Sequence, residues 1–230
     1  GRSLTLTYAT GQTRVQSIFD GTRTWTYGYD GTGNLQTVTR PDATSWTYAF
    51  AGFTKRILYN ADVSCGNGGT FQNPGETSGS ITHPSGAVAT FTIAPQRHGR
   101  SWTGYGCEPL NAVNYDPLTF DTLSIVRKVI TGSALPTMTW SYNYGATNHC
   151  WTGKNAPAPV CSVSSPTTKT VNVIDPEGEV TQLTFGNRTM GTDLERNEGK
   201  LLKTEQGAPG AWKRVDTSTF NTPVGPNPVG

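Results

Sequence analysis

The sequence predicts an all-β protein made of antiparallel hairpins, on the basis of its strand alternation, its repeats and its turns. Large apolar residues alternate with smaller residues in several short segments, which is typical of a strand with one buried face. They share one parity within each segment: Trp25, Tyr27 and Tyr29; Trp46, Tyr48 and Phe50; and Trp140, Tyr142 and Tyr144. We expect Trp25, Trp46 and Trp140 to belong to the core.

The repeats and turns favour the same fold. Trp25-Thr26-Tyr27 recurs as Trp46-Thr47-Tyr48, and self-similarity of this kind indicates a repeat architecture. Between predicted strands lie Asp20-Gly21 and Asp30-Gly31, where we expect the glycine to supply the positive φ of a tight hairpin. Residues 123–144 form a further predicted hairpin.

The composition favours a folded chain and argues against a nucleic-acid partner. Aromatic residues make up 10% of the 230 residues, and the net charge is only +2. Disordered chains combine low hydrophobicity with high net charge. This chain lacks the high net charge, and it is rich in Gly (27) and Pro (15), as many short strands joined by tight turns require. Nucleic-acid binding needs clustered Lys and Arg, and the basic residues here are spread thinly.

No membrane insertion is expected, because no apolar run approaches the roughly 18 residues that span a bilayer. The first residues have neither the charged region nor the apolar region of a signal peptide. They open on a strand-like segment, Leu4-Thr5-Leu6-Thr7-Tyr8. We therefore expect the chain to be a segment of a longer protein.

Four cysteines, Cys65, Cys107, Cys150 and Cys161, predict disulfides rather than a metal site, because the count is even and no Cys-x-x-Cys pair is present. A Cys150–Cys161 bond would close a short loop and contribute about 3 kcal/mol on the chain-entropy model. A Cys65–Cys107 bond would then enclose a loop-rich insertion. Three pairings are possible; we favour this one, and each implies an oxidising compartment.

One segment carries a more specific resemblance. Tyr29-Asp30-Gly31-Thr32-Gly33-Asn34-Leu35-Gln36-Thr37-Val38-Thr39-Arg40-Pro41-Asp42 resembles the YD repeat of the RHS family, with its Tyr-Asp pair, its Gly-x-Leu step and its closing Pro-Asp turn. Looser copies lie at residues 81–93, 173–185 and 198–204. Residues 52–80 and 94–122 depart from the repeat and look like insertions.

The resemblance implies a structural role. RHS/YD-repeat proteins form long strips of hairpins that spiral into a hollow shell, and in many bacterial members the shell encloses a C-terminal toxin. A similar chain is expected to be a stretch of such a shell in a secreted or surface-exported bacterial protein. Its expected partners are neighbouring repeats of a longer chain or an enclosed cargo.

We predict a single RHS/YD-repeat β domain over residues 1–220. Clear repeats occupy 1–51, partly inserted loops 52–122 and weaker repeats 123–220. Residues 221–230 are a Pro/Gly-rich tail. The predicted architecture is a twisted sheet or strip of antiparallel hairpins with a disulfide-stapled, loop-rich insertion.

Aromatic residues in loop-like or edge contexts suggest an alternative function, an extracellular module that binds a surface glycan or a protein. The candidates for ligand contact are Trp102, Tyr105, Trp151 and Trp212. Trp102-Thr103-Gly104-Tyr105-Gly106-Cys107 places two aromatic rings on a Gly-rich loop beside a cysteine. Packing of the insertion under its own loop would explain the same residues.

No catalytic chemistry is predicted. Nucleophilic catalysis needs a nucleophile, a base and an orienting group, and the sequence has no Gly-x-Ser-x-Gly elbow. His83, His98 and His149 lie in different segments, so we predict no metal site and no cofactor. The predicted function is a β-scaffold that encloses or presents a toxin or other cargo.

Overall fold

The structure is a computed structural model that describes residues 3–54, 60–61, 71, 73–104, 118–153, 156, 158–187 and 197–220. One four-residue helix, α1 (Ala51–Thr54), follows the fifth strand. The strands are β1 (Thr5–Tyr8), β2 (Val15–Phe19), β3 (Thr24–Tyr29), β4 (Leu35–Thr39), β5 (Ser45–Ala49), β6 (Asn60–Ala61), β7 (Thr77–Thr82), β8 (Val88–Gly99), β9 (Thr103–Gly104), β10 (Thr119–Gly132), β11 (Leu135–Asn143), β12 (Trp151–Thr152), β13 (Thr168–Ile174), β14 (Val180–Gly186), β15 (Leu201–Ala208) and β16 (Ala211–Thr217).

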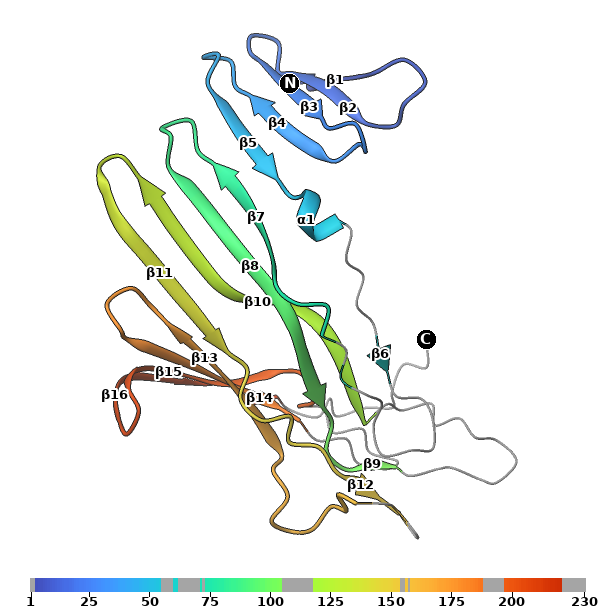
Figure 1. Ribbon diagram of the computed structural model, residues 1–230, viewed down its shortest axis with the longest axis vertical. Helices are drawn as coiled ribbons and strands as arrows, with labels where there is room; N and C mark the ends of the chain where they lie inside the picture. The colour runs from blue at the N-terminus through green and yellow to red at the C-terminus, as the bar shows by residue number, and fades with distance from the viewer. Residues whose placement is uncertain are drawn as a thin grey trace. The chain divides into compact units, whose positions relative to one another are not determined.

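Within the described residues, thirteen of the strands follow one hydrogen-bonded path, in the order β1-β2-β3-β4-β5-β7-β8-β10-β11-β13-β14-β15-β16 (Figure 1). Off this path, β6 pairs with β10, and β9 and β12 form a separate two-stranded sheet. The path never departs from chain order, so each strand pairs with the strands that come before and after it along the path. The predicted all-β fold of antiparallel hairpins is confirmed.

The chain divides into two compact units. The first comprises Gly1–Ile57, Glu76–Ile93 and Ile125–Thr139, and the second comprises Leu58–Gly75, Ala94–Ser124 and Trp140–Gly230. The first unit contains β1 to β5 and β7. The second contains β13 to β16 and the parallel pair β9 and β12. The predicted single domain over residues 1–220 stays a prediction.

Two predicted hairpin turns use different residues for their positive φ. Gly21 has a φ of 93° in the turn between β2 and β3, as expected. In the turn between β3 and β4 the residue with positive φ is Gly33, at 88°, and not Gly31. The carboxylate of Asp30 explains the longer loop, because it accepts hydrogen bonds from the backbone N–H groups of Thr32 and Asn34 at 2.9 Å each.

Four turns of the chain share one geometry. In each, the N–H of the fourth residue donates to the carbonyl of the first, and the N–H of the first donates to the carbonyl of the fifth. The fourth residue has positive φ, as in a type I turn followed by a bulge. These turns begin at Asp30, Arg40, His83 and Asp175, and their positive-φ residues are Gly33 (88°), Ala43 (62°), Gly86 (86°) and Gly178 (85°).

Ala43 is therefore the one residue of this set that carries a side chain in the left-handed region. We expect Ala43→Gly to raise the free energy of unfolding by about 0.5 to 1 kcal/mol, because it removes the clash between Cβ and backbone. The matched control is Gly86→Ala, where a Cβ meets nothing within 4 Å. It should lower the free energy by a similar amount. Urea denaturation of both variants measures the effect; equal signs would contradict it.

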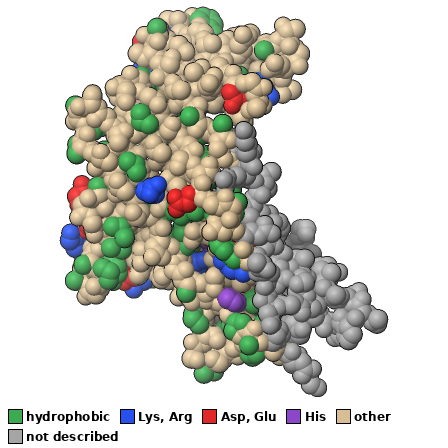
Figure 2. Space-filling view, viewed as in Figure 1, with side chains coloured by type: hydrophobic (Ala, Val, Ile, Leu, Met, Phe, Trp, Pro, Cys, Tyr) green, Lys and Arg blue, Asp and Glu red, His purple; other side chains and the backbone are tan. Residues whose placement is uncertain are grey.

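The sheet has few fully buried apolar side chains. Among the described residues they are Ala94, Leu118, Cys150 and Trp151, all in the second unit. Trp25, Trp46 and Trp140 were predicted to be core and are only half-buried. On the face shown in Figure 2, hydrophobic side chains lie in scattered groups among polar side chains and backbone. The tryptophans lie on strands whose faces nothing in the described chain covers completely.

The predicted insertion over residues 94–122 contains strand as well as loop. β8 continues to Gly99, and β10 already begins at Thr119. Residues 105–117 lie outside the described part of the chain. Gly99 at the end of β8 and Phe120 near the start of β10 line a cavity.

Candidate functional site

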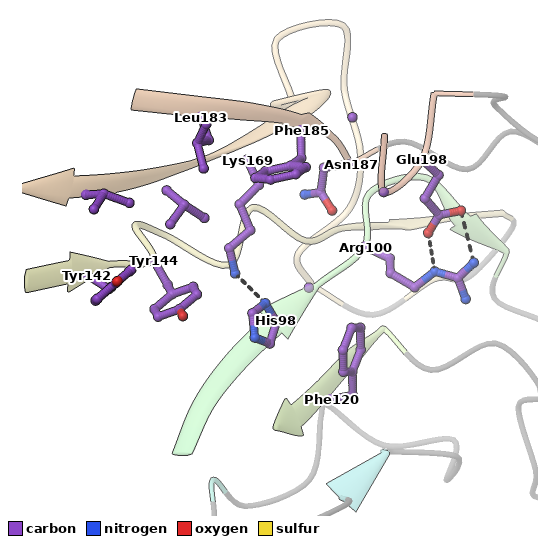
Figure 3. Close-up of a pocket in the computed structure, with 15 residues that line it drawn as sticks. His98, Arg100, Phe120, Tyr142, Tyr144, Lys169, Leu183, Phe185, Asn187 and Glu198 are labelled. Carbon is purple, nitrogen blue, oxygen red and sulfur yellow. Dashed lines mark hydrogen bonds and ion pairs between the residues drawn. The ribbon is translucent and has the colours of Figure 1, made fainter. Parts of the chain in front are cut away.

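The second unit contains a cavity of about 740 Å³. Its lining is mainly aromatic and aliphatic, with a few polar and charged side chains (Figure 3). The lining residues are His98, Gly99, Arg100, Phe120, Tyr142, Tyr144, Lys169, Val171, Val173, Leu183, Phe185, Gly186, Asn187, Glu198 and Gly199. The volume falls within the range of roughly 300 to 1,000 Å³ that ligand pockets occupy.

Alternation along three neighbouring strands builds the apolar wall. Lys169, Val171 and Val173 share one parity on β13, so their side chains emerge on one face of the sheet. The register continues this face onto both neighbours: Tyr142 pairs with Val173 on one side, and Leu183 and Phe185 pair with Val171 and Lys169 on the other. The apolar wall of the cavity is therefore a direct consequence of strand periodicity and register.

Lys169 extends along this face to His98 (Figure 3). Its Nζ lies 3.0 Å from Nδ1 of His98 and 3.4 Å from the carbonyl oxygen of Arg97. Burial, followed by the charge of Lys169, lowers the pKa of His98 to about 4. At neutral pH the imidazole is therefore uncharged, and its Nδ1 accepts a hydrogen bond from the ammonium. Burial also lowers the pKa of Lys169 to about 8.

Aromatic contacts hold the His98 ring in place. The ring stacks on Phe120, with a centroid distance of 5.4 Å and an interplanar angle of 23°. Tyr144 approaches it edge-on, at 5.8 Å and 83°. Burial raises the pKa of the Tyr144 hydroxyl, so this phenol stays neutral at physiological pH.

An ion pair forms the polar part of the lining. Nε and Nη2 of Arg100 donate to the two carboxylate oxygens of Glu198 at 2.5 and 3.1 Å. The backbone fixes Glu198 near this position, because the N–H of Gly199 donates to the carbonyl of Gly186 at 2.8 Å. Two-point pairing of this kind gives a guanidinium a defined orientation.

A second ion pair supports the strands that carry the cavity. Asp121 of β10 is fully buried, and its carboxylate accepts hydrogen bonds from Nε and Nη2 of Arg97 at 2.7 and 2.9 Å. Arg97 is the residue before His98 on β8, and Asp121 follows Phe120 on β10. The pair thus links the two strands that position the stacked rings.

The structure confirms the predicted Cys150–Cys161 disulfide. Two of the predicted ligand-contact aromatics lie beside it. The backbone N–H of Trp102 donates to Sγ of Cys161 at 3.1 Å, and Trp151 on β12 pairs with Thr103 on β9. Cys65, Cys107 and Tyr105 lie outside the described residues, so the Cys65–Cys107 bond stays a prediction.

The described aromatics differ in how far their rings are exposed, and ligand contact at them stays a prediction. Trp151 is only 1% exposed, so its ring is part of the interior and presents no face to an external ligand in this conformation. Trp102 is half-buried and has a φ of 61°. Trp212 lies on β16, opposite Gly207 of β15, and is also half-buried. The structure brings Trp102 and Trp151 together and leaves Trp212 on a different element.

The polar residues of the cavity were not predicted from the sequence. Lys169 shares parity with Val171 and Val173, which marks it as a charged residue on an apolar face. That signal was available. The partner, His98, lies 71 positions earlier on β8, and no local pattern connects the two.

Asn187 has a structural position at the end of β14. Its side chain is 5% exposed and donates to the carbonyl oxygens of Thr147, at 3.4 Å, and Asn148. Its backbone carbonyl accepts a hydrogen bond from the N–H of Ser101 at 2.8 Å. Through its side chain and its backbone, Asn187 therefore ties together the three segments around the end of the cavity.

Comparison with protein-family models found no match, and comparison with curated proteins found no significantly similar sequence. In the part of the chain that the structure describes, no helix is long and apolar enough to cross a membrane. The described residues also contain no group of three or more His, Cys, Asp or Glu side chains suited to a metal ion. The disulfide is compatible with an extracellular location.

Proposed function

We propose that the chain is a structural segment of an exported bacterial β-scaffold of the RHS/YD-repeat type, which encloses or presents a toxin or other cargo. The observation that carries the proposal is the serial strand order, in which thirteen strands of the described chain pair along one path without departing from chain order. A sheet built this way extends by adding hairpins, as a repeat protein does.

The shared turn geometry supports the same proposal. Four turns, beginning at Asp30, Arg40, His83 and Asp175, use the same hydrogen bonds and the same position of positive φ. Three of them place Pro at the second position: Pro41, Pro84 and Pro176. A turn that recurs in both compact units is typical of a duplicated structural element.

The sparse core supports a scaffold whose faces are covered by something else. The first unit has no fully buried apolar side chain among its described residues. Hydrophobic burial is the main favourable term in folding, and half-exposed strands gain only part of it. Large apolar residues such as Leu4, Leu6 and Tyr8 on or beside β1 are 44 to 65% exposed. Further repeats or a cargo packed on these faces would remove this area from water.

The proposal is tested on the native protein in its source organism. An antibody raised against this chain should detect, by immunoblot, a polypeptide several times larger than 24.7 kDa. After native purification, limited proteolysis should leave the scaffold and an enclosed segment intact, and mild denaturant should expose that segment to cleavage. A native polypeptide close to 24.7 kDa would contradict the shell and favour a small binding module.

A further inference from the structure

The ammonium of Lys169 differs from the other charged groups around the cavity. Arg100 pairs with Glu198 and Arg97 pairs with Asp121, so each guanidinium faces a carboxylate. Within the described residues, the hydrogen bonds of the Lys169 ammonium go to neutral acceptors, Nδ1 of His98 and the carbonyl of Arg97.

The position of this cation is energetically unfavourable unless a counter-charge joins it. Lys169 is only 7% exposed. A buried charge is normally paired with an opposite charge, and an ammonium has three N–H donors, of which two are used here. The cavity lies directly beside the group, so a ligand that enters it reaches the ammonium without moving the strands.

The remaining lining residues determine what kind of ligand body fits the cavity. Val171, Val173, Leu183, Phe185 and Phe120 line the cavity together with the rings of Tyr142 and Tyr144. These side chains offer aliphatic and aromatic surface and few hydrogen-bonding groups. A ligand that fits must therefore be apolar over most of its length and carry its polar group at the Lys169 end.

We propose that this cavity binds a small carboxylic acid with an aliphatic or aromatic body, whose carboxylate accepts a hydrogen bond from Lys169 while its body packs against the β11–β13–β14 wall. The neutral ring of His98 keeps Lys169 aimed at the cavity without neutralising its charge. The guanidinium of Arg100 is held by Glu198, so it does not compete for the ligand carboxylate.

Other ligand classes fit less well. An amine would meet the positive charge of Lys169. A sugar would need many polar partners, and the wall offers mainly hydrocarbon. A phosphate would require more donors than one ammonium supplies, since phosphate sites in proteins use several N–H groups. The buried ammonium of Lys169 and the apolar wall together favour a monocarboxylate.

The inference goes beyond the proposed scaffold function and does not depend on it. Isothermal titration calorimetry near neutral pH measures it, with decanoate as the test ligand and decan-1-ol as its neutral counterpart. Decanoate should saturate one site per chain. Decan-1-ol should bind about ten- to a hundredfold more weakly, because it lacks the charge-assisted hydrogen bond.

Two variants complete the test. Lys169→Met keeps the length of the side chain and removes the charge. It should weaken the binding of decanoate by the same factor and leave the binding of decan-1-ol unchanged. Lys213→Met, at an exposed lysine on β16 that pairs with Glu179, should change the binding of neither decanoate nor decan-1-ol. Circular dichroism checks that both variants fold. Equal binding of the acid and the alcohol, unchanged decanoate binding in Lys169→Met, or no binding at all would overturn the proposal.

Discussion

Replacement of Asp121 with alanine should lower the free energy of unfolding by about 3 to 5 kcal/mol, the usual loss when one partner of a buried ion pair is removed. Asp121 is fully buried, and its carboxylate accepts two hydrogen bonds from Arg97. The substitution leaves the guanidinium in a partly buried position without this carboxylate. Because whole domains are stable by only about 5 to 15 kcal/mol, the loss is a large fraction of the total.

Urea denaturation followed by tryptophan fluorescence measures this loss. The matched control is Asp216→Ala on β16, whose ion pair with Arg214 is exposed. That variant should lose less than about 1 kcal/mol, as surface ion pairs do. The double variant Arg97→Met/Asp121→Ala should be at least as stable as Asp121→Ala alone, because it removes the guanidinium as well. A loss at Asp121 no larger than at Asp216 would contradict a stabilising buried pair.

The fold was predictable because its determinants are local. The alternation around Trp25 and Trp46 identified the strands that the structure assigns as β3 and β5. Strand periodicity and turn chemistry act over a few residues, so a single sequence contains them in full. The same argument explains the confirmed hairpin between β10 and β11.

Where a turn depended on more than local composition, the prediction failed. Asp30-Gly31-Thr32-Gly33 has two glycines, and either could have supplied the positive φ. The choice of Gly33 follows from the hydrogen bonds that the Asp30 carboxylate accepts and from the backbone hydrogen bonds between Asp30 and Gly33 and between Asp30 and Asn34. Ala43 also shows that the turn geometry, and not the residue type, sets the positive φ: the shared turn places an alanine where composition alone predicts glycine.

The cavity could not be predicted, because it depends on distant segments. Parity places Lys169 on one face with Val171 and Val173, but it does not say what faces them. The answer depends on where β8 ends, on the register of β13 with β14, and on the return of Glu198 to Arg100, a separation of 98 positions. The tryptophans show the same limit: a period of two assigns Trp140 to a face but does not say how fully that face is covered.

Replacement of Lys169 with methionine should stabilise the protein near neutral pH by about 2 to 3 kcal/mol. Burial lowers the pKa of this amine from 10.5 to about 8. A pKa difference of one corresponds to about 1.4 kcal/mol, and the loss of the hydrogen bonds that the ammonium donates to His98 and to the carbonyl of Arg97 offsets part of the gain. The cost exists because below pH 8 the folded protein must hold a buried charge that the unfolded chain exposes to water. Methionine removes the charge and keeps the packing.

The sign of the pH dependence follows from proton linkage. Between pH 8 and 10.5 the unfolded chain binds more protons at Lys169 than the folded chain, so the stability of the natural protein rises with pH in this window. The advantage of Lys169→Met should therefore be constant below pH 8 and shrink above it. The charged and titratable groups around Lys169 are common to both proteins: His98, Tyr142, Tyr144, Arg97, Asp121, Arg100 and Glu198.

Urea denaturation of both proteins at intervals from pH 7 to pH 10 gives this difference directly. The Lys213→Met control should change the free energy of unfolding by less than about 1 kcal/mol, because its ion pair with Glu179 is exposed. Saturating decanoate near neutral pH should stabilise the natural protein and not Lys169→Met, since the bound carboxylate supplies the missing counter-charge. If Lys169→Met were less stable than the natural protein at pH 7, Lys169 would be acting as a structural hydrogen-bond donor.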